Sequence, residues 1–326
     1  MPANLPPQYF EAEKRYRTAK DPEEKIEALQ TMLAIMPKHK GTDKLHAELR
    51  RKIAKFSQET ERKYATARRT GFYIKREGAG QVILVGPPSV GKSQILAALT
   101  KATPEIAAYP FTTKVPMPGM ANFEDIQIQL VDTPPIGHKE IRILFANTLR
   151  GTDLIAIVVD LSLESLNQVE NTLQELKGVR IEPRAEGMGQ ITPGSYPKKM
   201  LIIGNKNDQE GSHDNWKALY SQYFRFFPMI SISAKEGKGL EELRTTIYHA
   251  LEIVRVYTKT PGSKVNLSDP MVLRKGSTVE EAAESIHKDF RIELKYAVVW
   301  GSGKYEGQRV GRKHILQDRD IIEFHT

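Results

Sequence analysis

Short apolar runs alternate with amphipathic stretches between residues 80 and 255. The apolar runs are QVILVG (81–86), IQIQLVDT (126–133), DLIAIVVDLS (153–162), KMLIIGNKND (199–208) and FPMISISAK (227–235). The stretches 93–102, 141–151 and 240–254 instead have the apolar spacing of helices. Apolar strands separated by helices predict a mostly parallel sheet with helices on both faces. We therefore expect an α/β domain here.

The N-terminal segment has a helical pattern throughout. Apolar residues recur three and four apart in KIEALQTMLAIM (25–36), and residues 8–70 as a whole are expected to form helices. One helix is expected to begin at Pro22, after a capping Asp21, and a second to run over residues 42–67. This pattern predicts a helical hairpin or arm.

The C-terminal segment changes to short strand-like runs around one helix. That helix lies in GSTVEEAAESIHKDF, where Thr278 and Glu281 form a capping pattern. Strands on both sides of a single helix predict a small α+β module. The Gly- and Pro-rich stretch 178–198 predicts a long loop with room for a hairpin. The predicted domains are thus a basic helical arm (1–76), an α/β domain (77–253) and a C-terminal module (254–326).

Composition narrows the class of protein. No stretch approaches the roughly 18 apolar residues of a membrane span, so no membrane partner is expected. The polar N-terminus does not resemble a signal or transit peptide, and the chain has 0 cysteines, which excludes disulfides and cysteine zinc sites. We expect a cytoplasmic protein.

The net charge of the chain is concentrated at one end. Residues 1–76 contain 18 Lys and Arg against 10 Asp and Glu, so they account for the whole net charge of +8. Such a basic arm is typical of proteins that bind nucleic acid, but it is equally typical of a solvated helical face.

GPPSVGKS, residues 86–93, follows an apolar strand and precedes a helix, as the P-loop pattern requires. The glycines permit a tight path that turns backbone N–H groups toward phosphates, and the helix N-terminus adds positive charge. Lys92 is expected to reach the β- and γ-phosphates, and Ser93 to give its hydroxyl to Mg²⁺. This motif does not distinguish ATP from GTP. The expected phosphate-binding residues are Gly86, Pro87, Pro88, Ser89, Val90, Gly91, Lys92, Ser93 and Gln94.

A second motif indicates which nucleotide base is bound, and it is Asn205-Lys206-Asn207-Asp208. It lies at the carboxyl end of a buried strand, where open α/β sheets bind ligands. The Asp208 carboxylate can accept hydrogen bonds from N1–H and the 2-amino group of guanine, whereas adenine has neither donor. Lys206 would pack its stem over the ring, and Asn205 would tie the loop to the P-loop. After the next strand, Ser233-Ala234-Lys235 predicts a second base contact through the N–H of Ala234.

Two further stretches are candidates for sensing the γ-phosphate. Phe111-Thr112-Thr113 lies in a loop, where a threonine hydroxyl could complete the Mg²⁺ shell and order the loop with GTP. Asp132 ends an apolar strand and matches the acid that holds Mg²⁺ through water.

GPPSVGKS, YPFTTKVPMPGM, VDTP, NKND and SAK together resemble the Obg-like GTPases, most closely the developmentally regulated GTP-binding (DRG) branch. Residues 252–326 resemble that branch's C-terminal TGS domain, a ubiquitin-like β-grasp module. The resemblance implies a P-loop GTPase domain and GTP hydrolysis with Mg²⁺, and favours Thr113 over Thr112. It also implies association with the ribosome, or with rRNA or tRNA, through the TGS domain and the basic helices.

The chain departs from this family in its third motif. Asp132-Thr133-Pro134-Pro135 replaces the expected Asp-x-x-Gly, and Pro135 has no N–H to donate to a γ-phosphate. Ile136 stands where many GTPases have a water-orienting glutamine, and His138 is more typical of a surface residue than of a base. No general base is evident, which predicts slow intrinsic hydrolysis that a partner stimulates. The extra segment that some DRG members insert in the G domain is also expected to be absent.

Several alternatives stay open at this point. Some family members use K⁺ through a P-loop asparagine, but Ser89 occupies that position here. Basic and aromatic residues of the C-terminal module are candidates for RNA contact, although Tyr296 and Trp300 could be core residues. They are Lys264, Arg274, Lys275, Lys288, Arg309, Arg312, Lys313, Tyr296, Trp300 and Tyr305.

The leading functional hypothesis is a GTPase switch that acts on the ribosome or its RNA. A nucleotide-dependent RNA-binding or scaffold protein with little hydrolysis is the second hypothesis, which Pro135 favours. A P-loop ATPase is the third, and it requires the NKND match to be accidental.

Overall fold

A computed structural model describes most of the 326-residue chain. The described residues are 6–18, 22–37, 42, 45–56, 74–100, 116–135, 139–185, 191–260, 262, 265, 267 and 269–326. The chain divides into two compact units, Met1–Phe72 and Tyr73–Thr326. No helix among the described residues is long and apolar enough to cross a membrane.

The first unit is helical, as the apolar spacing predicts. It contains α1 (Pro7–Thr18), α2 (Pro22–Ile35) and a further helical stretch over residues 45–56. Because α2 begins at Pro22, the predicted helix start is confirmed. The three stretches share a small apolar core, and the basic residues Arg50, Arg51 and Lys55 are exposed. The members of this core are Tyr9, Ala12, Leu29, Met32, Met36 and Leu49.

The second unit contains a seven-stranded sheet in the order β2-β3-β1-β4-β6-β5, with β7 also pairing to β6. Every pairing is parallel except that of β2 with β3, so the predicted mostly parallel sheet is confirmed. The strands are β1 (Gln81–Val85), β2 (Met117–Phe123), β3 (Ile126–Asp132), β4 (Leu154–Asp160), β5 (Ile181–Pro183), β6 (Tyr196–Asn205) and β7 (Met229–Ser231).

Two of these strands differ from the sequence prediction. The sequence of β2, MPGMANF, does not alternate and contains Pro and Gly, but it forms an edge strand by pairing along the whole of β3. The sequence of 178–198 predicts a long loop with room for a hairpin. Instead, β5 pairs in parallel with residues 196–198 of β6.

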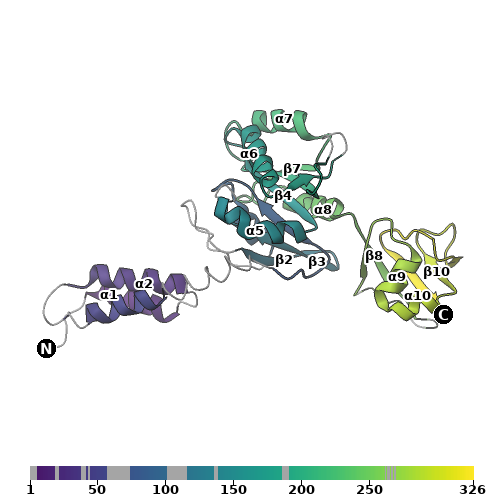
Figure 1. Ribbon diagram of the computed structural model, residues 1–326, viewed down its shortest axis with the longest axis horizontal. Coiled ribbons are helices and arrows are strands. Elements are labelled where there is room, and N and C mark those ends of the chain that lie inside the picture. Colours follow the sequence, from purple (N-terminus) through teal and green to yellow (C-terminus); the bar gives the residue numbers. More distant parts are fainter. Residues whose placement is uncertain are drawn as a thin grey trace. The chain divides into compact units, whose positions relative to one another are not determined.

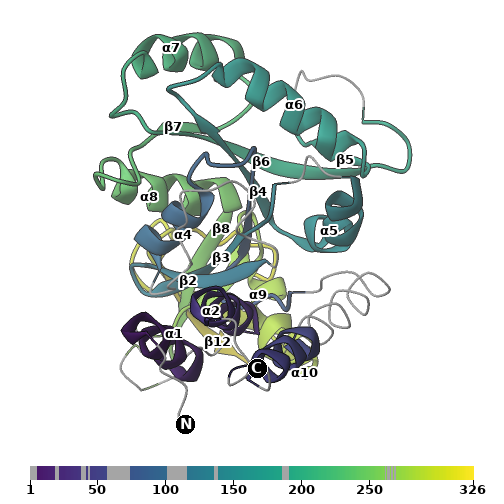
Figure 2. The same ribbon diagram turned by 90° about the vertical axis from the view of Figure 1, so that its left-hand side faces the viewer.

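Helices cover both faces of this sheet (Figures 1 and 2). In Figure 2, α4 (Lys92–Leu99) and α8 (Leu240–Leu251) lie on one side of the strands, and α5 (Lys139–Gly151) and α6 (Ser165–Lys177) lie on the other. A further helix, α7 (Ser212–Tyr223), contacts α6. Two-sided burial explains why the central strands are apolar at consecutive positions rather than at alternate ones.

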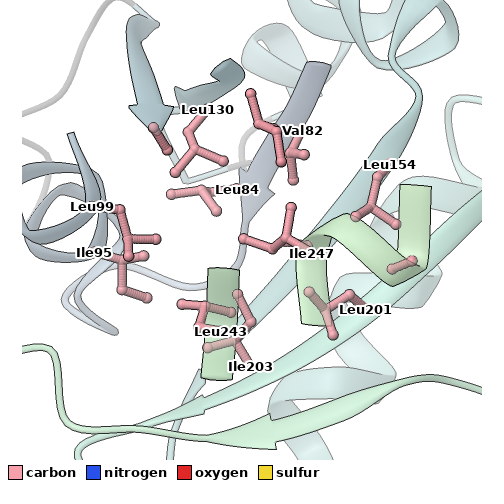
Figure 3. Packing of buried hydrophobic residues seen from close by; sticks show 14 of the residues in the cluster. Val82, Leu84, Ile95, Leu99, Leu130, Leu154, Leu201, Ile203, Leu243 and Ile247 are labelled. Carbon is pink, nitrogen blue, oxygen red and sulfur yellow. The ribbon is translucent and has the colours of Figure 1, made fainter. Parts of the chain in front are cut away.

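The core on the α4–α8 side consists of alternate strand residues (Figure 3). Val82 and Leu84 of β1 pack with Ile95 of α4 and Ile247 of α8, and all are almost completely buried. Burial of each such side chain contributes roughly 1.5–3 kcal/mol to folding. This core therefore holds the carboxyl ends of β1, β4 and β6 in fixed relative positions.

A second, five-stranded sheet has the order β11-β10-β12-β8-β9, and its β12–β8 pairing is parallel. Helix α9 begins with the predicted capping box, in which Thr278 and Glu281 exchange hydrogen bonds. Helix and sheet share one apolar core, as expected for a small α+β module. The elements are β8 (Ile253–Thr258), β9 (Met271–Arg274), α9 (Val279–Ile286), α10 (Lys288–Glu293), β10 (Tyr296–Trp300), β11 (Gln308–Val310) and β12 (Asp320–His325).

Arg255 of β8 joins the two sheets of this unit. Its side chain is only 3% exposed, and its guanidinium pairs with Asp318 at 2.7 Å and with Asp125 at 2.7 Å. It also pairs with Glu124, the neighbour of Asp125 in the turn between β2 and β3. One buried cation therefore holds three carboxylates, two of them in a turn of the larger sheet's domain.

Aromatic residues complete this cluster. The rings of Phe123 and Tyr248 stack with centroids 4.6 Å apart, and the Arg255 guanidinium lies 5.0 Å from the Tyr248 centroid. The Tyr248 hydroxyl donates to Asp318 at 2.5 Å. Burial alone would raise the pKa of Asp318, but hydrogen bonds from Arg255 and Tyr248 outweigh it and lower that pKa to about 2.

Replacing Arg255 with Met should lower the free energy of unfolding by about 2–4 kcal/mol at pH 7, because three carboxylates lose their shared cation. Asp318 has a lowered pKa, so its ionised form stabilises the fold above its usual value of 3.8, and this stabilisation is lost as pH falls through about 2. Acid unfolding of R255M should therefore begin at a higher pH. Urea titrations across pH would measure both effects.

The matched control is Arg319→Met, since the exposed Arg319 pairs with the same Glu124 from the protein surface. Its unfolding midpoint should stay close to that of the unchanged protein. Equal losses in the two variants would contradict a central role for Arg255.

Candidate functional site

The P-loop lies between the end of β1 and the start of α4. Gly86 has φ of 148° and Gly91 has φ of 95°, in the region that glycine adopts without strain. A Cβ atom would collide with the Val158 carbonyl oxygen at Gly86 and with the Asn205 amide nitrogen at Gly91. Both glycines are therefore required by close packing of the loop against neighbouring strands. The backbone of Ser89 lies in the left-handed region, with φ of 62°.

Lys92 lies inside this loop and is 6% exposed. Its ammonium donates to the carbonyl oxygens of Gly86 at 3.0 Å and Pro87 at 2.8 Å. Burial lowers the pKa of Lys92 to about 8, against the opposing effect of the Asp132 charge. A buried lysine with so few counter-charges is suited to an anionic ligand.

Ser93 and Asp132 come together beside it. The Ser93 hydroxyl donates to Asp132 Oδ2 at 2.5 Å, although the two residues lie on α4 and β3. Asp132 ends β3 next to Leu84 of β1, and the following Thr133 donates its hydroxyl to the Leu84 carbonyl at 2.7 Å. This hydroxyl and carboxylate are the hard oxygen donors that Mg²⁺ prefers.

Asn205 connects three parts of the site. Its side-chain nitrogen donates to the carbonyl oxygen of Val90 in the P-loop at 2.8 Å. Its side-chain oxygen accepts from the backbone N–H of Ala234 at 3.0 Å. The side chain is buried, so one amide joins the P-loop to both segments predicted to contact the base.

Asp208 presents a carboxylate oxygen at this edge. Oδ2 accepts from Gln209 at 2.8 Å, whereas Oδ1 is buried and has no hydrogen bond of normal geometry within the described residues. The nearby Ser233 side chain is the main cause that lowers the pKa of Asp208, so the carboxylate is ionised at neutral pH. Such an oxygen can accept a hydrogen bond from a ligand.

Lys206 and the 233–235 segment complete the base side of the site. Lys206 has φ of 64°, an uncommon conformation for a residue with a side chain. Its ammonium is paired at 2.5 Å with Asp160, a residue that belongs to none of the predicted motifs. The sequence feature that could have indicated Asp160 as a site residue is its position as an acid at the end of the apolar run LIAIVVD. Ser233 is buried and accepts from the N–H of Glu236, whereas Lys235 is exposed.

Some predicted residues lie outside the described part of the chain. These are Thr112 and Thr113, Ile136 and His138, so the expected switch contacts stay predictions. Pro134 and Pro135 are described and buried.

Comparisons with known proteins agree with this geometry. The family model described as "50S ribosome-binding GTPase" matches residues 81–186, and the TGS domain model matches residues 254–326. An uncharacterized GTP-binding protein of Schizosaccharomyces pombe is 30% identical over 357 residues, which cover 92% of this chain and 97% of that protein. The developmentally-regulated GTP-binding protein 2 homolog of Dictyostelium discoideum is 29% identical over 363 residues, with 92% and 98% covered.

The chain belongs to the developmentally regulated GTP-binding (DRG) family. It is a GTP-binding protein with a P-loop GTPase domain and a TGS domain. A solved GTP-binding protein of Pyrococcus horikoshii OT3 has the same fold, with a TM-score of 0.51, 17% identity, and coverage of 76% of this chain and 99% of that protein. The two alignments above are longer than this 326-residue chain, so those two relatives contain residues that it lacks.

Nucleotide binding to this DRG-family protein should weaken as pH rises through about 8. Phosphates favour protonated Lys92 and raise its pKa, so binding takes up a proton once free Lys92 is partly neutral. We expect GDP affinity to be about threefold lower at pH 8.5 than at pH 7.5. Calorimetry in two buffers of different ionisation enthalpy would detect the proton.

Lys92→Arg is the control, since an arginine stays charged throughout this range. Its affinity should be almost independent of pH between 7.5 and 8.5. Identical pH profiles for the two proteins would show that Lys92 does not titrate.

Replacing Asp208 with Asn should reverse the base preference. Asn presents an amide donor to guanine N1–H, but it can pair with the additional carbonyl of xanthine. We expect GDP affinity to fall by at least about 100-fold while XDP affinity rises. Competition against a fluorescent GDP or XDP would measure both constants.

Asp214→Asn removes an acid from the first turn of α7, close in sequence to Asp208, and should leave the preference unchanged. A D208N protein that still prefers GDP over XDP would overturn the guanine-reading role of Asp208.

Proposed function

We propose that this protein hydrolyses GTP with Mg²⁺ and acts as a switch on the ribosome or its RNA in the cytoplasm. The observation that carries this proposal is the double contact of Asn205 with Val90 and Ala234. It brings a triphosphate-binding loop and an ionised aspartate that can read guanine to one edge of the sheet. Adenine has neither the N1–H nor the 2-amino donor that guanine offers to an acceptor at Asp208.

Positioning and charge stabilisation would provide the catalysis. Lys92 and the P-loop N–H groups would neutralise charge on the β- and γ-phosphates. Ser93 and Thr113 would hold Mg²⁺ through their hydroxyls, and Asp132 through water, with phosphate oxygens completing the shell. The 2.5 Å contact between Ser93 and Asp132 fits this role, because both side chains already face one point. Mg²⁺ would draw charge from the phosphate oxygens.

Guanine would lie between Asp208, the stem of Lys206 and Ala234. The Ala234 N–H donates to Asn205 at 3.0 Å here, so the predicted base contact through this N–H would require a change of partner. Asn205 would hold these segments against the P-loop, and Ser233 and Lys235 would border the base. K⁺ is a second candidate cofactor, for which Ser89 gives the P-loop a hydroxyl rather than an amide at the position concerned. Comparing turnover in K⁺ and Na⁺ would decide it.

Hydrolysis is proposed to be slow without a partner. Pro135 has no N–H for a γ-phosphate, and no general base was evident in the sequence. A ribosomal partner would supply the missing catalytic groups. Pro135 also favours the second candidate function, a guanine-nucleotide-dependent RNA-binding or scaffold protein with little hydrolysis.

RNA contact is proposed for the TGS domain. The Arg309 guanidinium lies 3.6 Å from the Tyr296 ring centroid, and that ring stacks on His325 at 4.5 Å. Lys259 lies 4.3 Å from the Trp300 centroid on the same sheet. Tyr296 and Trp300 are half-buried and lie outside the apolar core of the domain. Planar cationic and aromatic groups of this kind suit RNA phosphates and unstacked bases.

The other candidate residues add charge at the surface. Arg274, Lys275, Lys288, Arg312, Lys313 and Tyr305 are exposed, whereas Lys264 lies outside the described residues. The exposed Arg50, Arg51 and Lys55 of the N-terminal unit would provide a second basic surface for rRNA or tRNA.

Phosphate release from GTP and ATP, measured with and without ribosomes, tests the proposal. We expect GTP turnover alone, slow in isolation and at least about tenfold faster with ribosomes. Co-sedimentation should be stronger with a non-hydrolysable GTP analogue than with GDP, and weaker for R309A/Y296A. GTP binding with no phosphate release in either condition would favour the scaffold function, and equal sedimentation in both nucleotide states would count against a switch.

A further inference from the structure

Asp160 is the buried carboxylate that ends β4. Its side chain is 5% exposed, and in the sheet the residue lies opposite Asn205, which precedes Lys206. Oδ2 accepts from the Lys206 ammonium at 2.5 Å. Oδ1 accepts from the backbone N–H of Ser162 at 2.9 Å and from its hydroxyl at 2.6 Å. Both carboxylate oxygens are therefore engaged, and within the described part of the chain Oδ2 accepts from the lysine alone.

The backbone of Asp160 is held in place as well. The Gln168 side chain of α6 accepts from the Asp160 N–H at 2.8 Å and donates to its carbonyl oxygen at 3.0 Å. Because Asp160 is fixed through both its backbone and its side chain, it holds the Lys206 ammonium in one position. The bonds to Ser162 and Gln168 explain why Asp160 is rigid, but they do not require its charge.

Lys206 is held at both ends as a result. Its backbone has the left-handed φ of 64°, and its ammonium is fixed by Asp160, while its side chain stays 33% exposed. A free lysine side chain has many rotamers, and ordering one on binding costs conformational entropy. With both ends fixed, the four-carbon stem forms an apolar platform before any ligand arrives.

We propose that Asp160 is a positioning residue of the guanine site, which orders the stem of Lys206 for contact with the purine ring. This inference rests on the proposed guanine site and adds a residue to it. Asp160 would set how long a guanine nucleotide stays bound, whereas Asp208 would set which base is chosen. The two roles are separable by experiment, because stacking over a ring is insensitive to its hydrogen-bonding edge.

Asp160→Asn is the test variant, since asparagine has the same shape and keeps an acceptor for Ser162. It presents a neutral amide to the Lys206 ammonium instead of a charge. We expect a fluorescent GDP to dissociate about 3- to 10-fold faster, which corresponds to ordering one lysine side chain. The ratio of GDP to XDP affinity should stay unchanged.

Asp153→Asn, at the position just before the same strand, is the matched control. Asp153 immediately precedes β4 at the opposite edge of the sheet, pairs with Arg76 and accepts from the Gln81 N–H at 2.9 Å. It therefore loses a carboxylate–cation pair of the same kind, far from the base. Its GDP dissociation rate should equal that of the unchanged protein.

A double-mutant cycle with Lys206→Met distinguishes positioning from a purely structural role. Met keeps an apolar side chain but has no ammonium for Asp160 to hold, so D160N should have little further effect in the K206M protein. Full additivity of the two effects, or a D160N protein that releases GDP at the unchanged rate, would overturn the inference. Thermal unfolding of each variant checks the fold. If D160N does not fold, K206M alone must accelerate GDP release.

The same measurements distinguish this inference from the proposed guanine site on which it rests. Failure of the unchanged protein to bind GDP would remove the guanine site and Asp160's role together. Normal GDP binding combined with an unaffected D160N protein would remove only the role of Asp160.

Discussion

The candidate site depends on one buried amide, that of Asn205. Its two polar atoms connect the P-loop after β1 with the segment after β7, across the carboxyl ends of neighbouring parallel strands. A buried amide left without these partners would cost about 1–3 kcal/mol. The Asn205 side chain is therefore favourable in its buried position only when both segments provide their hydrogen bonds. Gly91 is part of the same constraint, because any side chain there would occupy the space of the Asn205 amide.

Around that amide, the site contains groups that are unfavourable in the absence of a ligand. Lys92 is buried with a lowered pKa, Ser89 and Lys206 have left-handed backbones, and Asp208 has a buried carboxylate oxygen without a normal hydrogen bond among the described residues. The packed sheet core must supply the free energy that holds them. A nucleotide would relieve several of these costs at once, which is the physical basis for expecting tight binding to this edge of the sheet.

Arg255 has a comparable role at the other end of β3. That strand runs from the β2–β3 turn, where Glu124 and Asp125 face Arg255, to Asp132 beside the P-loop. One strand thus connects the expected Mg²⁺ site with the buried cation that joins the TGS sheet. The two ends differ in chemistry, since the first is arranged for a ligand and the second is already satisfied by protein groups.

The sequence alone determined the α/β fold, the P-loop, the guanine motif and the capping box of α9, because each depends on local spacing or on continuous burial. It could not reveal that MPGMANF is a strand, since this segment is ordered by pairing with β3 and not by its own pattern. Nor could it predict the partners of Lys206 and Arg255. Asp160 precedes Lys206 by 46 residues and Glu124 precedes Arg255 by 131, and only tertiary packing of separate strands brings such charges together.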